Sequence, residues 1–134
     1  MVVDDEPDFL ELVTYLLQRE GYEIITAADG LAALEKARWQ NPDLILLDLM
    51  LPELDGLSVC EILRRHPATA EIPVIFITAC VSEPLHQYGL EHGAKDYLTK
   101  PVNLAELLQR VRSVLPEACQ PEPKAVTQES PPGK

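Results

Sequence analysis

Basic residues are scarce in this chain of 134 amino acids, which has 11 lysines and arginines against 22 acidic residues and a formal net charge of -11. A protein that binds DNA or RNA directly needs a basic face, so the composition argues against direct nucleic-acid binding. Long hydrophobic runs are missing too, because no apolar stretch approaches the roughly 18 residues that cross a bilayer and no basic, apolar leader is present. We therefore expect no contact with a membrane.

Cysteine and catalytic groupings are equally sparse. The cysteines are an odd number without the spacing of a metal site: Cys60, Cys80 and Cys119. Two of them fall in apolar stretches, which indicates reduced core thiols in a cytoplasmic protein. No internal repeat, glycine-rich phosphate loop or serine-histidine-aspartate grouping is visible. The histidines stand away from the predicted strand ends and are expected at the surface: His66, His86 and His92.

The sequence does contain enough apolar material for one domain with a core, since 46% of its residues are hydrophobic. The run Leu44-Ile45-Leu46-Leu47 ends abruptly on Asp48. Such a short run predicts a strand buried on both faces, as in parallel sheets. Because a charge is costly to bury, Asp48 taken alone is expected either at the sheet's rim facing a pocket, or as a helix cap or solvated loop acid.

Further strands and helices alternate along the chain. The predicted strands cover residues 1–3, 22–27, 44–47, 72–77 and 95–99. The predicted helices cover about residues 7–20, 30–39, 57–66, 83–92 and 104–115. Ser58 with Glu61, and Asn103 with Glu106, have the spacing of capping boxes. Trp39 is expected to pack at the end of its helix.

Alternating strands and helices predict an α/β fold in which helices cover both faces of a parallel sheet. Right-handed crossovers favour the flavodoxin-like order 2-1-3-4-5, a five-stranded sheet in a three-layer sandwich. We expect one domain over residues 1–116. Five of the 12 prolines lie in the last 19 residues, so residues 117–134 are expected to form a disordered tail or linker.

In this order, ligands bind beyond the carboxyl ends of the first and third strands. Those ends carry Asp4, Asp5 and Asp48, and the fourth and fifth strands end at Thr78 and Lys100. Three crowded carboxylates repel one another, and their pKa values rise unless a cation joins them. Carboxylate oxygens suit Mg²⁺. Asp48 is then a metal ligand and a candidate nucleophile, while Lys100 and Thr78 are candidate partners of phosphoryl oxygens.

These residues fall in motifs that resemble one family, the receiver domains of two-component response regulators, including the chemotaxis regulators. The resemblance covers about residues 1 to 115. It rests on Asp48 and on the following segments: Val2-Val3-Asp4-Asp5-Glu6-Pro7, Met50-Leu51-Pro52, Asp55-Gly56, Thr78-Ala79 and Gly93-Ala94-Lys95-Asp96-Tyr97-Leu98-Thr99-Lys100-Pro101. Each motif alone is weak evidence for the family, but all of them together, in this order and at these spacings, are specific to it.

The resemblance implies a phosphorelay switch rather than a turnover enzyme. Asp48 would accept a phosphoryl group from a phosphohistidine on a sensor histidine kinase or a histidine phosphotransfer protein. Mg²⁺ would be held directly by Asp5, by Asp48 and by the Met50 carbonyl, and through water by Asp4. Thr78 and Lys100 would contact the phosphoryl oxygens, and Lys100-Pro101 would be a cis peptide.

The family also implies how the signal is read. Tyr97 would be a switch aromatic that turns inward as Thr78 moves, although an ordinary strand aromatic is the simpler alternative. The surface of the fourth helix, fifth strand and fifth helix would bind a downstream protein partner. Asp96 and Arg110 resemble charges that pair across receiver dimers. Because Tyr88 stands where a basic residue would help, we expect a monomer or a phosphorylation-dependent dimer.

The chain departs from the family pattern at several positions. The first strand starts at Met1 and is short, and Val102 stands where an aromatic is common, which is expected to loosen its loop. Met50 and Cys80 flank the phosphorylation site with side chains that cannot position a water molecule. We therefore predict slow self-dephosphorylation.

Three alternatives remain open. The chain could be the receiver portion of a longer transcriptional or enzymatic regulator or hybrid kinase, with the Pro-rich segment as its linker. A haloacid-dehalogenase-type aspartyl phosphatase also uses an Asp at a strand end, but it needs a second acid where this chain has Met50. A flavin-binding flavodoxin-like protein needs a hydroxyl-rich loop after the first strand, where this chain has acids.

Overall fold

The computed structural model describes residues 1–79, 87, 90–91 and 93–115. The strands are β1 (Val2–Val3), β2 (Thr26–Ala27), β3 (Ile45–Leu47), β4 (Val74–Thr78) and β5 (Ala94–Thr99). The helices are α1 (Pro7–Arg19), α2 (Gly30–Gln40), α3 (Gly56–Arg65) and α5 (Leu104–Val114). The helix predicted over residues 83–92 lies largely outside the described residues, as do residues 117–134, Cys80, His86, Tyr88, His92 and Cys119.

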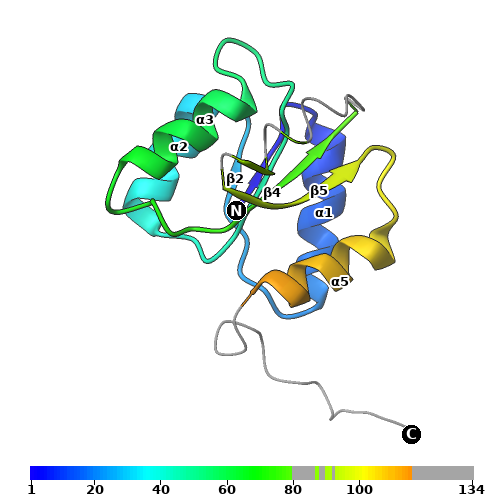
Figure 1. The fold of residues 1–134 in the computed structure, drawn as a ribbon. Helices are drawn as coiled ribbons and strands as arrows, with labels where there is room; N and C mark the ends of the chain where they lie inside the picture. The colour runs from blue at the N-terminus through cyan, green and yellow to red at the C-terminus, as the bar shows by residue number, and fades with distance from the viewer. Residues whose placement is uncertain (80–86, 88–89, 92, 116–134) are drawn as a thin grey trace, which may run out of the picture.

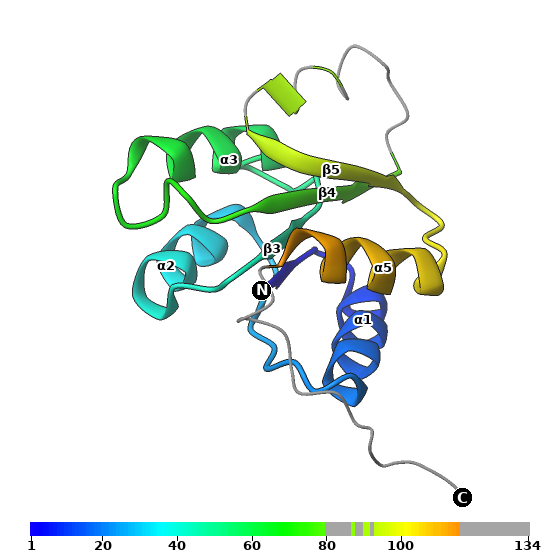
Figure 2. The ribbon, with the colours of Figure 1, turned by 60° about the horizontal axis from the view of Figure 1, so that its bottom comes forward.

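The strands form one five-stranded sheet in the order β2-β1-β3-β4-β5, and every pair is parallel (Figure 1). This confirms the α/β fold and the strand order predicted above. Helices α2 and α3 cover one face of the sheet, and α1 and α5 cover the other, which Figure 2 shows from a second side. In the described part of the chain, no helix is both long and apolar enough to cross a bilayer.

Two cores follow from the period-two alternation of the strands. Val3, Ile45, Leu47, Val74 and Phe76 face α2 and α3, where Cys60 is fully buried as predicted. The intervening strand residues face α1 and α5: Val2, Leu46, Ile75 and Ile77. Because both faces are covered, β1, β3 and β4 are apolar up to their ends, whereas the edge strand β5 carries the exposed Lys95 and the half-buried Asp96.

Helices α2, α3 and α5 begin at side-chain caps, whereas α1 begins at Pro7 without one. Asp29 accepts a hydrogen bond from the Ala32 amide at 2.8 Å, and Asn103 accepts one from the Glu106 amide at 3.0 Å. The second of these agrees with the spacing noted in the sequence. The Ser58–Glu61 capping box is wrong, because Asp55 caps α3 and accepts from the Ser58 amide at 2.9 Å. An acid before Gly56 therefore starts the helix one turn earlier than that pattern suggests.

Three other local predictions are corrected. The second strand is Thr26–Ala27 rather than residues 22–27, because the two residues of β1 pair with Thr26 and Ala27, and the Val2 amide reaches back no further than the Ile25 carbonyl, at 2.8 Å. Trp39 does not pack against the core, and 78% of its surface is exposed. Trp39 lies in the last turn of α2, on the side of the helix that faces solvent. Helical periodicity alone does not predict which side of a helix meets the core. His66 is half-buried rather than fully at the surface.

Candidate functional site

The polar residues at the strand ends meet because of strand register. Val3 pairs with Leu47, and the Asp48 amide donates to the Val3 carbonyl at 3.1 Å, so Asp4 and Asp48 leave the sheet side by side. Thr78 pairs with Thr99, and the Lys100 amide donates to the Thr78 carbonyl at 2.9 Å. Four neighbouring strands thus bring their polar ends to one edge, as the sequence predicted.

The acids form a compact trio. Carboxylate oxygens of Asp4, Asp5 and Asp48 lie within 4.8 Å of one another. Asp4 and Asp48 are 1% and 5% exposed, whereas Asp5 is exposed to solvent. Two buried carboxylates and one exposed carboxylate supply the hard oxygen donors that Mg²⁺ prefers. The donor set therefore fits a magnesium ion.

Lys100 partly neutralises this cluster. Its ammonium nitrogen lies 2.7 Å from Asp4 Oδ2, 2.8 Å from Glu6 Oε1 and 3.3 Å from Asp48 Oδ2. Burial would lower the pKa of Lys100, but the hydrogen bonds to Asp4 and Glu6 and the charge of Asp48 outweigh it and raise that pKa. Burial also raises the pKa of Asp4, an effect that Lys100 partly offsets and the charge of Asp48 increases. The rise for Asp4 has the direction expected of crowded carboxylates.

Backbone amides orient the two buried carboxylates. Asp48 Oδ1 accepts from the Met50 amide at 2.9 Å, and Asp4 Oδ1 accepts from the Glu6 amide at 2.9 Å. In each residue the other oxygen, Oδ2, is the one that contacts Lys100. Gly56 makes this arrangement possible, because a Cβ atom there would lie 2.3 Å from the Asp48 carbonyl oxygen. The start of α3 therefore packs directly on the backbone of Asp48.

The remaining predicted residues lie around this cluster. Thr78 is completely buried at the end of β4. Tyr97 is half-buried, and its ring meets that of Phe76 edge-on with centroids 6.5 Å apart. Met50 is 62% exposed. Lys100-Pro101 is cis, as the resemblance implied.

Two residues that contact Lys100, Glu6 and Phe9, are not among the site residues predicted from the sequence. Glu6 forms one of its two shortest ion pairs, and the ring of Phe9 lies with its centroid 4.4 Å from the ammonium nitrogen. Glu6 follows Asp5 directly, and Phe9 opens the apolar stripe of α1 nearest the strand ends. The sequence shows that both residues lie close to Asp4 and Asp5 along the chain. It does not show that they contact Lys100, which follows the carboxyl end of β5.

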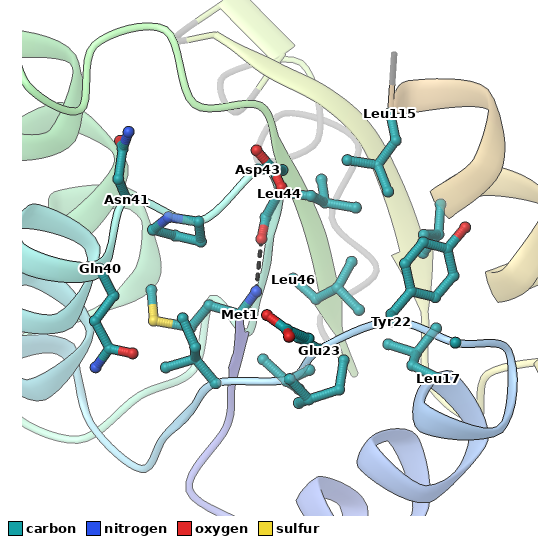
Figure 3. Close-up of a pocket in the computed structure, with 16 residues that line it drawn as sticks. Met1, Leu17, Tyr22, Glu23, Gln40, Asn41, Asp43, Leu44, Leu46 and Leu115 are labelled. Atoms are coloured by element: carbon teal, nitrogen blue, oxygen red, sulfur yellow. Dashed lines mark hydrogen bonds between the residues drawn. The ribbon is translucent and has the colours of Figure 1, made fainter. Parts of the chain in front are cut away.

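A cavity of about 580 Å³ lies at the opposite edge of the sheet, at the amino ends of the strands. Figure 3 shows Tyr22 and Leu115 on one side of it, and Gln40 and Asn41 on the other. The Met1 amino group donates to the Leu44 carbonyl at 2.7 Å inside it. Burial lowers the pKa of this amino group from 8.0 to about 6. The cavity contains none of the predicted site residues.

Comparisons with known proteins agree with the fold. The family model "Response regulator receiver domain" matches residues 1–112. The chain is 47% identical over 115 residues to the alkaline phosphatase synthesis transcriptional regulatory protein PhoP of Bacillus subtilis, covering 86% of this chain and 47% of that protein. It is 44% identical over 115 residues to the DNA-binding dual master transcriptional regulator RpaA of Synechocystis, covering 86% of this chain and 48% of RpaA.

A solved structure supports the same assignment. The chemotaxis protein CheY4 of Vibrio cholerae superimposes with a TM-score of 0.80 at 34% identity, covering 85% of this chain and 95% of that one. The chain spans about half the length of the two regulators named above.

A doubly wound parallel sheet with three acids and a lysine at its carboxyl edge defines a flavodoxin-like α/β protein. With the family match over residues 1–112, the chain belongs to the receiver domains of two-component response regulators. Receiver domains are phosphoacceptor signalling domains that bind Mg²⁺ at an acidic cluster and interact with histidine kinases. This membership argues against the dehalogenase-type phosphatase and the flavin-binding protein.

Proposed function

We propose that Asp48 is the phosphoacceptor and that Asp4, Asp5, Asp48 and the Met50 carbonyl hold Mg²⁺, with Asp4 acting through water. The observation that carries the proposal is the position of Asp48 Oδ2, which lies 3.3 Å from Lys100 beside two further carboxylates. Oδ2 attacks the phosphorus of a phosphohistidine on a sensor histidine kinase or histidine phosphotransfer protein. The P–N bond breaks, and its electron pair leaves with the imidazole.

The chain's own residues stabilise the transferred group. Lys100 exchanges contacts with Asp4 and Glu6 for a phosphoryl oxygen, and the buried Thr78 hydroxyl donates to another. The bound Mg²⁺ supplies positive charge next to the phosphoryl oxygens. The Met50 side chain is exposed beside Asp48 and has no group that positions water, which supports slow self-dephosphorylation.

The signal leaves the site through β4 and β5. Phe76 and Tyr97 pair across β4 and β5, two residues before Thr78 and three residues before Lys100 respectively. A movement of Thr78 toward the phosphoryl group would change the packing of Tyr97 and the surface of the fourth helix, β5 and α5. That surface binds a downstream protein partner in the cytoplasm.

A second form of output is favoured by one observation. The chain covers only 47% and 48% of two transcriptional regulators that it resembles. Residues 117–134 would then link the receiver domain of residues 1–116 to an effector module, in place of a separate partner. Asp96 and Arg110 form an ion pair of 2.5 Å within the chain, so dimerisation on phosphorylation would require these charges to exchange partners.

Intact mass spectrometry after incubation with Mg²⁺ and acetyl phosphate tests the proposal. We expect one phosphoryl adduct on the wild type and none on Asp48→Ala or without Mg²⁺. Asp43→Ala, which changes an exposed acid at the opposite edge of the sheet, is the matched control and should be phosphorylated normally. A wild type that takes up no phosphoryl group, or an adduct that persists in Asp48→Ala, would rule out Asp48 as the acceptor.

A further inference from the structure

The ammonium group of Lys100 lies between acids and an aromatic ring. The carboxylates of Asp4, Glu6 and Asp48 contact it, and the centroid of the Phe9 ring lies 4.4 Å away. Phe9 belongs to the first turn of α1, whereas Lys100 follows β5. The Lys100 side chain is only 15% exposed. The ring therefore forms part of the wall that confines the ammonium group.

Phe9 is itself held in place by packing. It is half-buried and packs against the core between the sheet and helices α1 and α5. Its position does not depend on Lys100 alone, because α1 as a whole is anchored by the buried Val13 and Leu17. A flexible lysine thus meets a ring whose location is set by the helix.

The acids do not favour the geometry that phosphoryl transfer needs. Asp4 and Glu6 lie 2.7 and 2.8 Å from the ammonium nitrogen, closer than Asp48 at 3.3 Å. Glu6 is 63% exposed, and a lysine that follows it moves toward solvent. The face of an aromatic ring attracts a cation without competing for its hydrogen bonds to anions. Phe9 can therefore hold the ammonium group while all of its N–H donors remain available to oxygen acceptors.

We propose that Phe9 is a positioning residue that keeps the Lys100 ammonium group beside Asp48, where the oxygens of an incoming phosphoryl group arrive. The proposal rests on the proposed role of Asp48 as phosphoacceptor. An aliphatic side chain would preserve the packing of α1, but it lacks the ring quadrupole. The aromatic face, rather than the bulk of the residue, is the feature that matters.

The rate of phosphorylation by acetyl phosphate in Mg²⁺ is the first readout. We expect Phe9→Leu to lower this rate about fivefold, the factor that a cation–π contact of ordinary strength supplies. Phe9→Tyr should restore the rate, because it keeps the ring. Tyr15→Leu is the matched control, since it replaces another aromatic of α1 that is 61% exposed, and its rate should equal that of the wild type. In a Lys100→Met background, Phe9→Leu should cause no further loss.

A second readout reports the contact itself. The ε-methylene resonances of Lys100 in a 13C-lysine-labelled protein should show a ring-current shift in the wild type and Phe9→Tyr that Phe9→Leu loses. Loss of the shift together with the fivefold rate effect supports the proposal. An unchanged rate in Phe9→Leu, an equal loss in the Lys100→Met background, or no ring-current shift in the wild type would overturn it. A wild type that shows the shift but takes up no phosphoryl group would instead refute the role of Asp48.

Discussion

The Lys100 ammonium nitrogen lies 3.3 Å from Asp48 Oδ2, although the two residues are 52 positions apart in the sequence. Parallel pairing of β3, β4 and β5 creates this contact, because each strand ends at the same edge of the sheet. Lys100 also pairs with Asp4 and Glu6, so in this structure it balances several acids at once. Its removal should therefore affect both charge balance and phosphoryl transfer.

Lys100→Met should lower the rate of phosphorylation by acetyl phosphate about a hundredfold, the usual effect of removing one donor to a developing oxyanion. The measurement is the time course of the phosphoryl adduct by intact mass. Lys95→Met is the matched control, because Lys95 is an exposed lysine of β5, the strand that Lys100 follows, and it should behave as the wild type. Circular dichroism checks that the variant folds. A Lys100→Met protein phosphorylated at the wild-type rate would contradict the role given to Lys100.

Gly56→Ala should destabilise the fold and slow phosphorylation together. The new Cβ atom would lie 2.3 Å from the Asp48 carbonyl and 2.8 Å from the Leu49 Cα, so α3 has to move away from the site. Overpacking of this kind costs about 1–3 kcal/mol of unfolding free energy. Urea denaturation measures the loss, and Gln109→Ala on an exposed position of α5 is the control. Unchanged stability and rate would show that the approach of α3 to Asp48 is not needed.

Arg64→Met should destabilise the fold by removing the hydrogen bonds that connect α3 to the start of β5. The Arg64 guanidinium donates to the Ala70 carbonyl at 3.0 Å and to the Gly93 carbonyl at 3.2 Å. Hydrogen bonds from a charged donor contribute about 1.5–3 kcal/mol each, less where the freed carbonyls regain water, so we expect a net loss of about 1–2 kcal/mol in urea denaturation. Arg65→Met, at the adjacent exposed position, should change stability by less than about 0.5 kcal/mol. Equal losses of stability in the two variants would show that the Arg64 hydrogen bonds do not stabilise the fold.

The buried Met1 amino group should make stability rise with pH. Its pKa is about 6 in the folded protein and 8.0 ordinarily, so the unfolded chain binds more protons between these values. The free energy of unfolding should increase by about 2–3 kcal/mol from pH 6 to pH 8 and level off above pH 8. Below pH 6 the amino group is charged in both the folded and the unfolded chain, so the free energy of unfolding should stay at its lower value.

The measurement is urea denaturation of a chain with a free Met1 amino group across this pH range. The same chain acetylated at Met1 is the control, because it carries no charge there but keeps the histidines that titrate in the same window. The difference between the two chains isolates the amino group. A constant difference from pH 6 to pH 8 would show that the amine is not desolvated in the folded state.

The sequence by itself determined the order of helices and strands, the parallel sheet and the edge at which Asp4, Asp5, Asp48, Thr78 and Lys100 meet. Apolar runs that end on polar residues are a local signal, and the handedness of crossovers leaves few ways to join them. The strand order then follows, and it brings the strand ends together without knowledge of any side-chain contact.

Only the tertiary structure decided which side chains touch. The contact between Phe9 and Lys100, the approach of Gly56 to the Asp48 backbone, and the exposure of Trp39 depend on where separate elements come to rest against one another. The periodicity of a helix indicates which residues share a face, but it does not state what that face meets. Packing between distant segments supplies that information, because those contacts form only when the whole sheet is assembled.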